Sequence, residues 1–423
     1  MEGKVRVNWR SSLIMLAVLS SACGPAASPP SPTAPPAKPA ATAAPPTAAP
    51  ESKPAAPTLA AKPAAGAPTP AAAAPPLAKP NPADWERVKE AAKKEGKVVI
   101  SGPGFPGLRT GLTEGFQKTH GITLEYLGLG PGEVITRVDR ESKAGSVTID
   151  ANIGGTSSCW TMGDRGQIDE ASKLLADPGL FDPAVWRGGQ IRLVLPSPNM
   201  PKDFICGLQV AEWVMTDLFV NRDMVKPDTI QSWKDILKPE YKGKIASFDP
   251  RRAGSAQTTV AYLNTLFGEQ FIKDLYVGQE VAITADYGQL AEWVARGSYP
   301  IGLALVQANI EPLRAQGLPL ERVFPADGPG ALTGGFDTVH KIKGGPNPNA
   351  AAVFLNWFAS KEAQEIWERE MMETSLRADV PHKVPEYVIP KPGVSYTIND
   401  YDPDYFFNKR VPAIAKVTEL LGR

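Results

Sequence analysis

Polar and glycine-rich turns recur in this 423-residue sequence directly after short apolar stretches. Serine and threonine hydroxyls, together with backbone N–H groups at the start of a helix, can bind a carboxylate, a phosphonate or another oxyanion. An arginine can add a charge-assisted, two-point hydrogen bond to the same anion. We therefore expect a binding site for a small solute rather than a catalytic centre. Its candidate residues are Ser101, Gly102, Gly104, Gly155, Thr156, Ser157, Asp249, Arg251, Arg252, Ser255, Tyr287, Gln307 and Asp337.

Each candidate also has an interpretation that involves no ligand. Glycines such as Gly104 and Gly155 are an ordinary requirement of tight turns. The adjacent pair Arg251 and Arg252 could form part of a solvated face, and Tyr287 could be a half-buried tyrosine rather than a residue that stacks on a ligand. The sequence leaves these alternatives open.

The stretch from Val281 to Gly317 shows how the fold could position such turns. Val281 to Thr284 is a short β-branched strand, and a polar turn then leads into a helix that Gly297 ends. Ile301 to Val306 is a continuous apolar run typical of a buried strand, and a second helix follows from Gln307 to Gln316. Both turns are therefore expected at the carboxyl ends of parallel strands, where open α/β sheets bind ligands.

The rest of the chain after residue 82 continues this alternation of strands and helices. The pattern predicts two doubly wound α/β lobes joined by crossing strands. The first lobe is expected to have strands at 97–100, 122–127 and 150–153 and helices at 85–95, 106–118 and 133–144. The second lobe is expected to begin with a crossing strand at 210–221 and to contain a strand at 244–248 and helices at 229–237 and 256–267. The chain that returns to the first lobe is expected to form a strand at 334–339 and helices at 349–358 and 360–371.

The first 82 residues have a different composition from the rest. Basic residues at positions 4, 6 and 10 precede the apolar run Leu13 to Leu19, and small residues then lead to Cys23, as in a secretory signal peptide over residues 1–23. Residues 24–82 hold 19 of the 43 prolines and are otherwise mostly alanine, serine and threonine. Such a segment cannot form a core, so we expect a disordered tether.

Charge and motifs narrow the possible functions. The chain has 45 basic and 45 acidic residues and no long basic run, which argues against nucleic-acid binding. Its three histidines are isolated, and neither a zinc-binding spacing nor a nucleophile or nucleotide motif occurs. We expect no cofactor and no metal, and an exported hydrolase is the alternative of another class. Outside the cytoplasm Cys159 and Cys206 could form a disulfide, or they could be two buried thiols.

Several stretches in this order resemble the extracellular solute-binding proteins of ABC importers, and most closely the group that contains ferric-ion binding proteins. They are 85–96, 150–155, 232–237 with 241–245, and 352–358. The resemblance implies a two-lobed type II periplasmic-binding-protein fold that closes over a solute by hinge motion. Iron-binding members carry adjacent tyrosines where this chain has Gln307 and Ala308. The expected ligand is therefore an organic molecule or oxyanion, with iron held by other residues as the alternative.

The residues that end at Cys23 resemble the lipobox of bacterial lipoproteins, which implies lipidation and an anchor on the outer face of the cytoplasmic membrane; the alternative is an ordinary secretory signal. The expected partners are a small solute and an ABC transporter permease, and the protein is expected to be a monomer. The expected organisation is a first lobe from 83–210 and 326–380, a second lobe from 211–325, and a C-terminal extension, 381–423, wrapped around the outside of the lobes.

Overall fold

The computed structural model describes residues 80–215, 218–328, 330–333, 335–394, 396 and 401–422. The signal peptide, Cys23 and nearly all of the tether expected from the sequence lie outside these residues. Among the described residues, no helix combines the length and the apolar character that a bilayer-spanning segment needs.

The first lobe is built on a mixed sheet. β1 is parallel to β2 and β3, whereas β13 is antiparallel to both β3 and β5. Residues Val98 to Ile100 of the first strand are buried, as expected for a strand covered by helices on both faces. The strand order is β2 (Thr123–Gly128), β1 (Lys97–Gly102), β3 (Ala151–Gly154), β13 (Thr338–Lys341), β5 (Gly207–Gln209) and β4 (Arg192–Val194).

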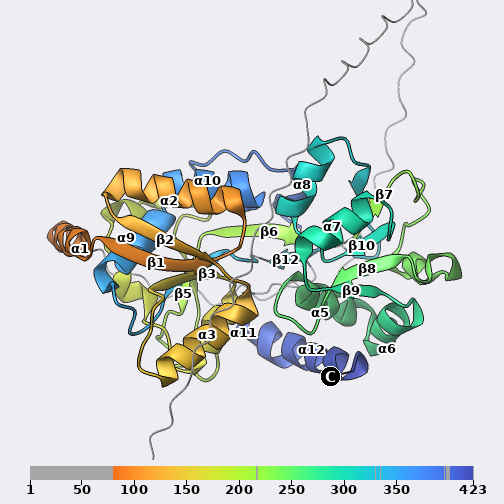
Figure 1. Cartoon of the computed structure of the whole chain (residues 1–423), viewed down its shortest axis with the longest axis horizontal. Helices are drawn as coiled ribbons and strands as arrows, with labels where there is room; N and C mark the ends of the chain where they lie inside the picture. Colours follow the sequence, from red (N-terminus) through yellow and green to blue (C-terminus); the bar gives the residue numbers. More distant parts are fainter. Residues whose placement is uncertain are drawn as a thin grey trace, which may run out of the picture. The chain divides into compact units, whose positions relative to one another are not determined.

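Helices cover this sheet, and their ends follow from local sequence. Asn81 caps the first helix through its side chain, and Gly96, with a φ of 73°, ends it. The aromatic side chains of Phe116, Phe354 and Trp357 pack together beneath them. Figure 1 shows α2 and α10 running side by side. The helices are α1 (Pro82–Glu95), α2 (Pro106–His120), α3 (Pro131–Lys143), α4 (Thr156–Asp164), α9 (Pro348–Phe358) and α10 (Lys361–Met371).

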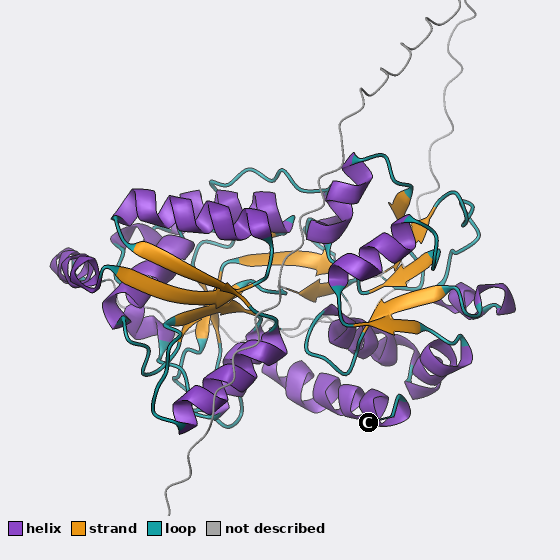
Figure 2. Ribbon diagram, in the orientation of Figure 1, coloured by secondary structure: helices purple, strands orange, loops and turns teal. Residues whose placement is uncertain are grey.

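The second lobe has its own sheet, flanked by helices (Figure 2). β8 is parallel to β9 and β10, as the sequence predicts, and β7 is antiparallel to β10 and β11. The strand order is β11 (Leu320–Arg322), β7 (Leu218–Asn221), β10 (Ile301–Leu303), β8 (Ile245–Phe248) and β9 (Ala282–Thr284), and the helices are α5 (Ser255–Phe267), α6 (Glu269–Lys273), α7 (Tyr287–Ala295) and α8 (Gln307–Ala315).

A small sheet connects the lobes. Its central strand, β6 (Ala211–Met215), pairs with β12 (Ala331–Thr333) and β14 (Thr374–Ser375). Figure 1 shows β6 and β12 between the two larger sheets. The single crossing strand expected at 210–221 is wrong in part, because β7 belongs to the second lobe's sheet and only β6 crosses. The two-lobed α/β fold with crossing strands is confirmed.

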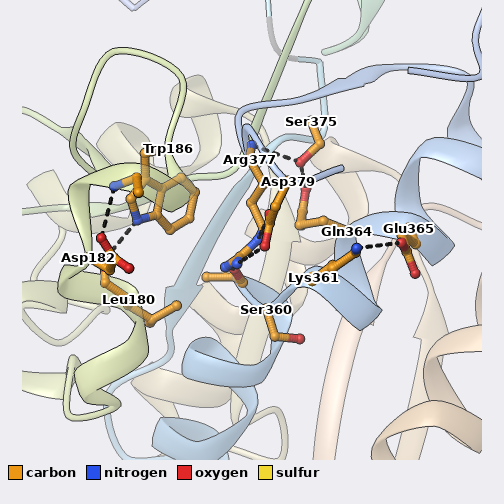
Figure 3. Close-up of polar contacts among 12 residues, drawn as sticks. Leu180, Asp182, Trp186, Ser360, Lys361, Gln364, Glu365, Ser375, Arg377 and Asp379 are labelled. Atoms are coloured by element: carbon orange, nitrogen blue, oxygen red, sulfur yellow. Dashed lines mark hydrogen bonds and ion pairs between the residues drawn. The ribbon is translucent and has the colours of Figure 1, made fainter. Parts of the chain in front are cut away.

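Arg377 fixes the chain to the first lobe after β14 (Figure 3). Its guanidinium donates to both carboxylate oxygens of Asp379 at 2.8 Å and to the carbonyl oxygen of Ala359 at 2.9 Å. The guanidinium carbon, Cζ, lies 5.4 Å from the ring centroid of Trp186. The Ser375 hydroxyl accepts from the Arg377 backbone N–H and donates to Gln364. The segment that follows β14 is therefore held in place by a network of hydrogen bonds.

Two expected elements are shorter than the sequence suggests. The helix expected at 229–237 is a 3₁₀ turn, η4 (Trp233–Leu237), because Asp327 accepts from the Ser232 hydroxyl and the Trp233 N–H and holds the preceding residues extended. The strand expected at 301–306 ends at Leu303, because Ala304 adopts a φ of 62° and turns the chain. The remaining short helical segments are η1 (Ala171–Leu174), η2 (Pro178–Phe181), η3 (Pro183–Val185), η5 (Pro239–Tyr241) and η6 (Asp274–Gly278).

The C-terminal segment, residues 401–422, packs into both lobes instead of wrapping around their outside. Phe406 lies 4.8 Å from Trp160 of the first lobe, centroid to centroid. Tyr405 and Val417 are buried in the core of the second lobe, and α12 packs on α5. The C-terminal helical elements are η7 (Glu386–Val388), α11 (Pro403–Tyr405), η8 (Phe406–Arg410) and α12 (Val411–Leu420).

Candidate functional site

A cavity of about 970 Å³ lies between the two lobes. The first lobe contributes the turns that follow β1 and β2 and the first turns of α3, and the second lobe contributes the turns that follow β8, β9 and β10. These are carboxyl ends of strands, the edge at which α/β sheets bind ligands. The lining residues, here called the outer cavity, are 103–106, 128–133, 136, 137, 140, 248, 251–253, 285–288, 306, 309 and 336.

Helix N-termini from both lobes line this space. The N-cap residues of α2 and α8, Phe105 and Val306, make no side-chain capping hydrogen bond. The N-cap residues of α4 and α5 are Gly155 and Gly254, which have no side chain and line an adjoining smaller space. Backbone N–H groups at an uncapped N-terminus carry a partial positive charge that favours an anion. The arrangement therefore suits a negatively charged group.

Four arginines line the outer cavity, and they differ in how firmly they are held. Arg137 pairs with Glu141 at 2.7 Å, so its charge is already compensated. Arg251 donates to both carboxylate oxygens of Asp249, at 2.8 and 3.0 Å. Arg252 lies 3.9 Å from the same carboxylate with 62% of its side chain exposed. Arg140 is exposed, and its side chain makes no salt bridge or hydrogen bond with any described residue.

Asp249 therefore binds the neighbouring arginines and does not line the cavity. Although burial raises it, the hydrogen bonds and charge of Arg251 leave the pKa of this carboxyl below its usual value. Asp249 stays ionised and fixes Arg251 at the cavity wall. The least compensated positive charge at the cavity wall comes from Arg140 and Arg252.

Tyr287 is held by contacts with Phe248 and Ser255. Its ring stacks on Phe248, with centroids 3.9 Å apart and an interplanar angle of 8°. Its hydroxyl oxygen accepts from the Ser255 N–H at 3.1 Å. Ser255 in turn donates its hydroxyl to the carbonyl oxygen of Ala304 at 2.6 Å, where the chain turns after β10. The stacking surface expected for a ligand is therefore partly occupied by Phe248.

A smaller space of about 70 Å³ continues the outer cavity toward the crossing strands. The two share Pro131, Tyr287, Val306 and Phe336 as common walls. The lining residues of this inner chamber are 131, 155–157, 213, 215, 254, 255, 258, 287, 306, 333, 335, 336, 373, 401 and 410.

Two buried carboxyl groups lie at or beside the inner chamber. Burial raises the pKa of Asp337 to about 7, although the Tyr401 hydroxyl and the Arg192 charge lower it. Burial also raises the pKa of Glu373 well above its usual value, and the nearby Asp337 raises it further. Glu373 lines the chamber, whereas Asp337 lies behind its wall. Arg192 pairs with Glu212 on β6.

The structure brings most of the predicted site residues to these spaces. Gly104, Arg251 and Arg252 line the outer cavity, and Tyr287 lines both spaces. Gly155, Thr156, Ser157 and Ser255 line the inner chamber.

The other five predicted residues line neither space. Ser101 is fully buried in β1 and donates its hydroxyl to Asn152 at 2.8 Å. Gly102 sits in the same strand against Tyr126. Asp249 is engaged by Arg251. Gln307 and Asp337 are buried in the interior, at 1% and 0% exposure.

Sequence reasoning also missed residues that line the site. Arg137 and Arg140 of α3 follow a glycine-rich turn, Gly128 to Gly132, which was a usable signal at the end of a strand. Trp213, Glu373 and the C-terminal Tyr401 and Arg410 reach the inner chamber only through the tertiary fold and leave no local pattern.

Cys159 and Cys206 form a disulfide, with Cα atoms 5.9 Å apart, which joins α4 to the segment before β5. The described part of the chain contains no group of three or more His, Cys, Asp or Glu side chains that could hold a metal ion.

Comparison with known proteins is decisive for the family. Residues 111–384 match the family described as bacterial extracellular solute-binding protein. The chain belongs to this family. An uncharacterized protein of Haemophilus influenzae is 36% identical over 295 residues, which are 67% of this chain and 78% of the relative. The chain is therefore a solute-binding protein of the kind that serves ABC transporters, and its place is outside the cytoplasm.

Solved structures agree on the fold of this solute-binding protein. The periplasmic binding protein AfuA from Actinobacillus pleuropneumoniae, with fructose-6-phosphate bound, is similar with a TM-score of 0.60 and 20% identity over 77% of this chain and 98% of that chain. Iron-bound HitA from Pseudomonas aeruginosa is similar with a TM-score of 0.57 and 14% identity over 77% of this chain and 99% of that chain. The fold is that of the type II periplasmic binding proteins, and the expected family is confirmed.

Proposed function

We propose that this solute-binding protein captures a small organic anion between its lobes and delivers it to an ABC importer. The observation that carries the proposal is the convergence of positive groups on one cavity. Helix N-termini without side-chain caps line it from both lobes, and Arg140 and Arg252 add charge that no described carboxylate fully compensates.

The anion class is supported over iron by the side chains at the cavity. Ferric iron prefers several oxygen ligands, and phenolates are well suited to it. The positions where the resembling iron-binding group carries tyrosines hold Gln307 and Ala308 here. The one tyrosine that lines the outer cavity, Tyr287, already uses its hydroxyl oxygen to accept from Ser255. Among the similar structures, AfuA with a bound sugar phosphate offers a better chemical match than iron-bound HitA.

The mechanism requires binding and closure without chemistry. An anion that reaches Arg140 from the first lobe, and Arg252 with the N-terminus of α8 from the second, contacts both lobes, so it favours the state in which the lobes approach. The crossing strands β6 and β12 are the natural hinge. We infer that the protein acts as a monomer anchored through lipidated Cys23 and that it is not an enzyme.

A thermal-shift screen tests the proposal. The panel contains phosphate esters, phosphonates and carboxylates, their uncharged analogues, polyamines and ferric citrate. A ligand that binds only the folded state raises the melting temperature by mass action. We expect at least one organic anion to raise it while its uncharged analogue does not. A shift by ferric citrate or a polyamine alone, with none by any organic anion, would show that the ligand class is wrong.

A further inference from the structure

Two buried polar side chains of the inner chamber each carry an atom that has no hydrogen-bond partner. Glu373 is 2% exposed and its Oε2 atom makes no hydrogen bond, and Trp213 is 4% exposed with an unpaired Nε1–H. Both side chains line the chamber. Buried polar groups are almost always satisfied, and leaving one unpaired costs free energy. The pair therefore indicates that something polar fits between them.

Gly335 lies beside both of these side chains. A Cβ atom built on this glycine would be 3.2 Å from Glu373 Oε1 and 3.3 Å from Trp213 Nε1. The carboxyl and the indole N–H therefore lie over the same face of Gly335, and the absence of a side chain leaves that face free for a ligand to approach. Gly335 has a φ of 59°, so a glycine also suits its backbone.

The chemistry of the two groups selects the occupant. An indole N–H only donates, so it needs an acceptor. A carboxyl group can accept, and when protonated it can also donate. A hydroxyl is the small group that accepts from the indole and donates to the carboxyl at the same time. The chamber, at about 70 Å³, has room for one or two groups of that size, since a water molecule occupies roughly 30 Å³ of liquid.

We propose that the inner chamber is a hydroxyl-recognition subsite, in which Trp213 and Glu373 bind a hydroxyl at the end of the ligand opposite its anionic group. This deepens the proposed function and rests on it. The outer cavity and the chamber meet at Tyr287 and Val306, so one molecule can occupy both. The ligand class becomes a hydroxylated organic anion, such as a polyol phosphate or a hydroxycarboxylate.

The position of the chamber links recognition of the hydroxyl to closure. Trp213 lies on the crossing strand β6 and pairs in register with Thr333 of β12. Glu373 directly precedes β14, which pairs with the same strand. A hydroxyl bound here contacts the segments that must bend when the lobes move.

Matched pairs of ligands test the subsite in the full mature protein. Each pair shares an anionic group and differs in hydroxyls, for example glycerol 3-phosphate with propyl phosphate, and glycerate with propanoate. We expect at least one hydroxylated member to bind about tenfold more tightly than its partner, the effect of about one hydrogen bond. Trp213→Phe should abolish that preference, because it removes the N–H and retains an aromatic ring.

Gly335→Ala provides a second test, because its Cβ would cover the face of Gly335 that both groups adjoin and would crowd a hydroxyl bound there. It should also abolish the preference for the hydroxylated member. Gly121→Ala is the control, because it places alanine at a similar φ of 70° with nothing within 4 Å. Circular dichroism of each variant confirms folding. Binding of anions without any hydroxyl preference, or a preference that survives Gly335→Ala, would overturn the subsite alone. Failure of every anion to bind would overturn the proposed function with it.

Discussion

Arg251 and Asp249 form a two-point pair at the wall of the outer cavity, with Nε and Nη2 donating to the two carboxylate oxygens at 2.8 and 3.0 Å. The pair fixes Arg251 in place and satisfies most of its charge. The side chain of Arg252, the next residue in the chain, is 62% exposed and lies farther from that carboxylate, at 3.9 Å. The two neighbouring arginines therefore have different roles, and Arg252 is the one that can reorient toward a ligand.

Replacing the less constrained arginines should weaken anion binding. We expect Arg252→Ala and Arg140→Ala each to reduce affinity for the best anion by about 1.5 kcal/mol if each makes one charge-assisted hydrogen bond. Titration calorimetry measures the effect, which should shrink as salt is added because exposed charges are screened. Arg296→Ala is the control, since Arg296 is 63% exposed and lies outside both spaces. An equal loss of affinity in Arg296→Ala would show that Arg140 and Arg252 do not bind the ligand.

The anchoring prediction concerns Cys23. Replacing it with serine should release the mature protein from washed membranes into the soluble fraction, because lipidation requires the cysteine thiol. Immunoblots of the two fractions measure the outcome. Retention of Cys23→Ser at the membrane would contradict the anchor.

The Cys159–Cys206 disulfide should contribute to stability. It closes a loop with a sequence separation of 47, for which the chain-entropy model gives about 4 kcal/mol. We expect the double change Cys159→Ala and Cys206→Ala to lower the free energy of unfolding in urea by an amount of that order. Adding reductant should destabilise the parent protein and leave the double variant unchanged. An equal response of both proteins to reductant would assign the effect elsewhere.

The buried carboxyl of Asp337 should make stability depend on pH. Its pKa is raised from 3.8 to about 7, so the folded protein binds this proton more tightly than the unfolded chain does. The stability that the protonated Asp337 contributes to the folded protein is fully present below about pH 4 and is lost as the pH rises through about 7. Burial lowers the pKa of His340 from 6.5 to about 3. His340 therefore acts in the opposite direction, because it lowers the stability of the folded protein as the pH falls below 6.5.

The contribution of Asp337 is therefore measured as a difference. We expect Asp337→Asn to gain stability relative to the parent protein as the pH rises from 4 to 7, because the amide has no proton to lose. Urea denaturation at several pH values gives the two curves. Parallel curves over this range would show that Asp337 titrates normally. The variant keeps the ionisable residues near Asp337, which are Glu373, Tyr401 and Arg192.

Much of the fold could be predicted because each lobe follows simple periodicity. Strands such as 97–100 are short apolar runs, and glycines such as Gly96 and Gly297 end the helices where expected. The turns after β3 and β8, among them residues 155–157 and 251–255, line the outer cavity or the inner chamber, at the strand ends where the sequence places them. Ser101 shows the limit, since its neighbours fit the pattern but its own side chain lies inside the sheet against Asn152.

The inner chamber could not be predicted, for a physical reason. Trp213, Glu373 and Tyr401 come from three distant segments that meet only because β14 pairs with β6 and the C-terminal segment packs between the lobes. Each segment alone looks like an ordinary strand, helix end or tail. Their shared function depends on long-range pairing, which local sequence periodicity does not encode.

The most direct test of the central claim is a crystal structure of the protein with the strongest-binding anion from the screen. We predict that the anionic group lies in the outer cavity, within hydrogen-bond distance of Arg140 or Arg252 or of a helix N-terminus, with residues of both lobes in contact. A ligand bound outside the cleft, or bound with its uncharged end at these groups, would contradict the account.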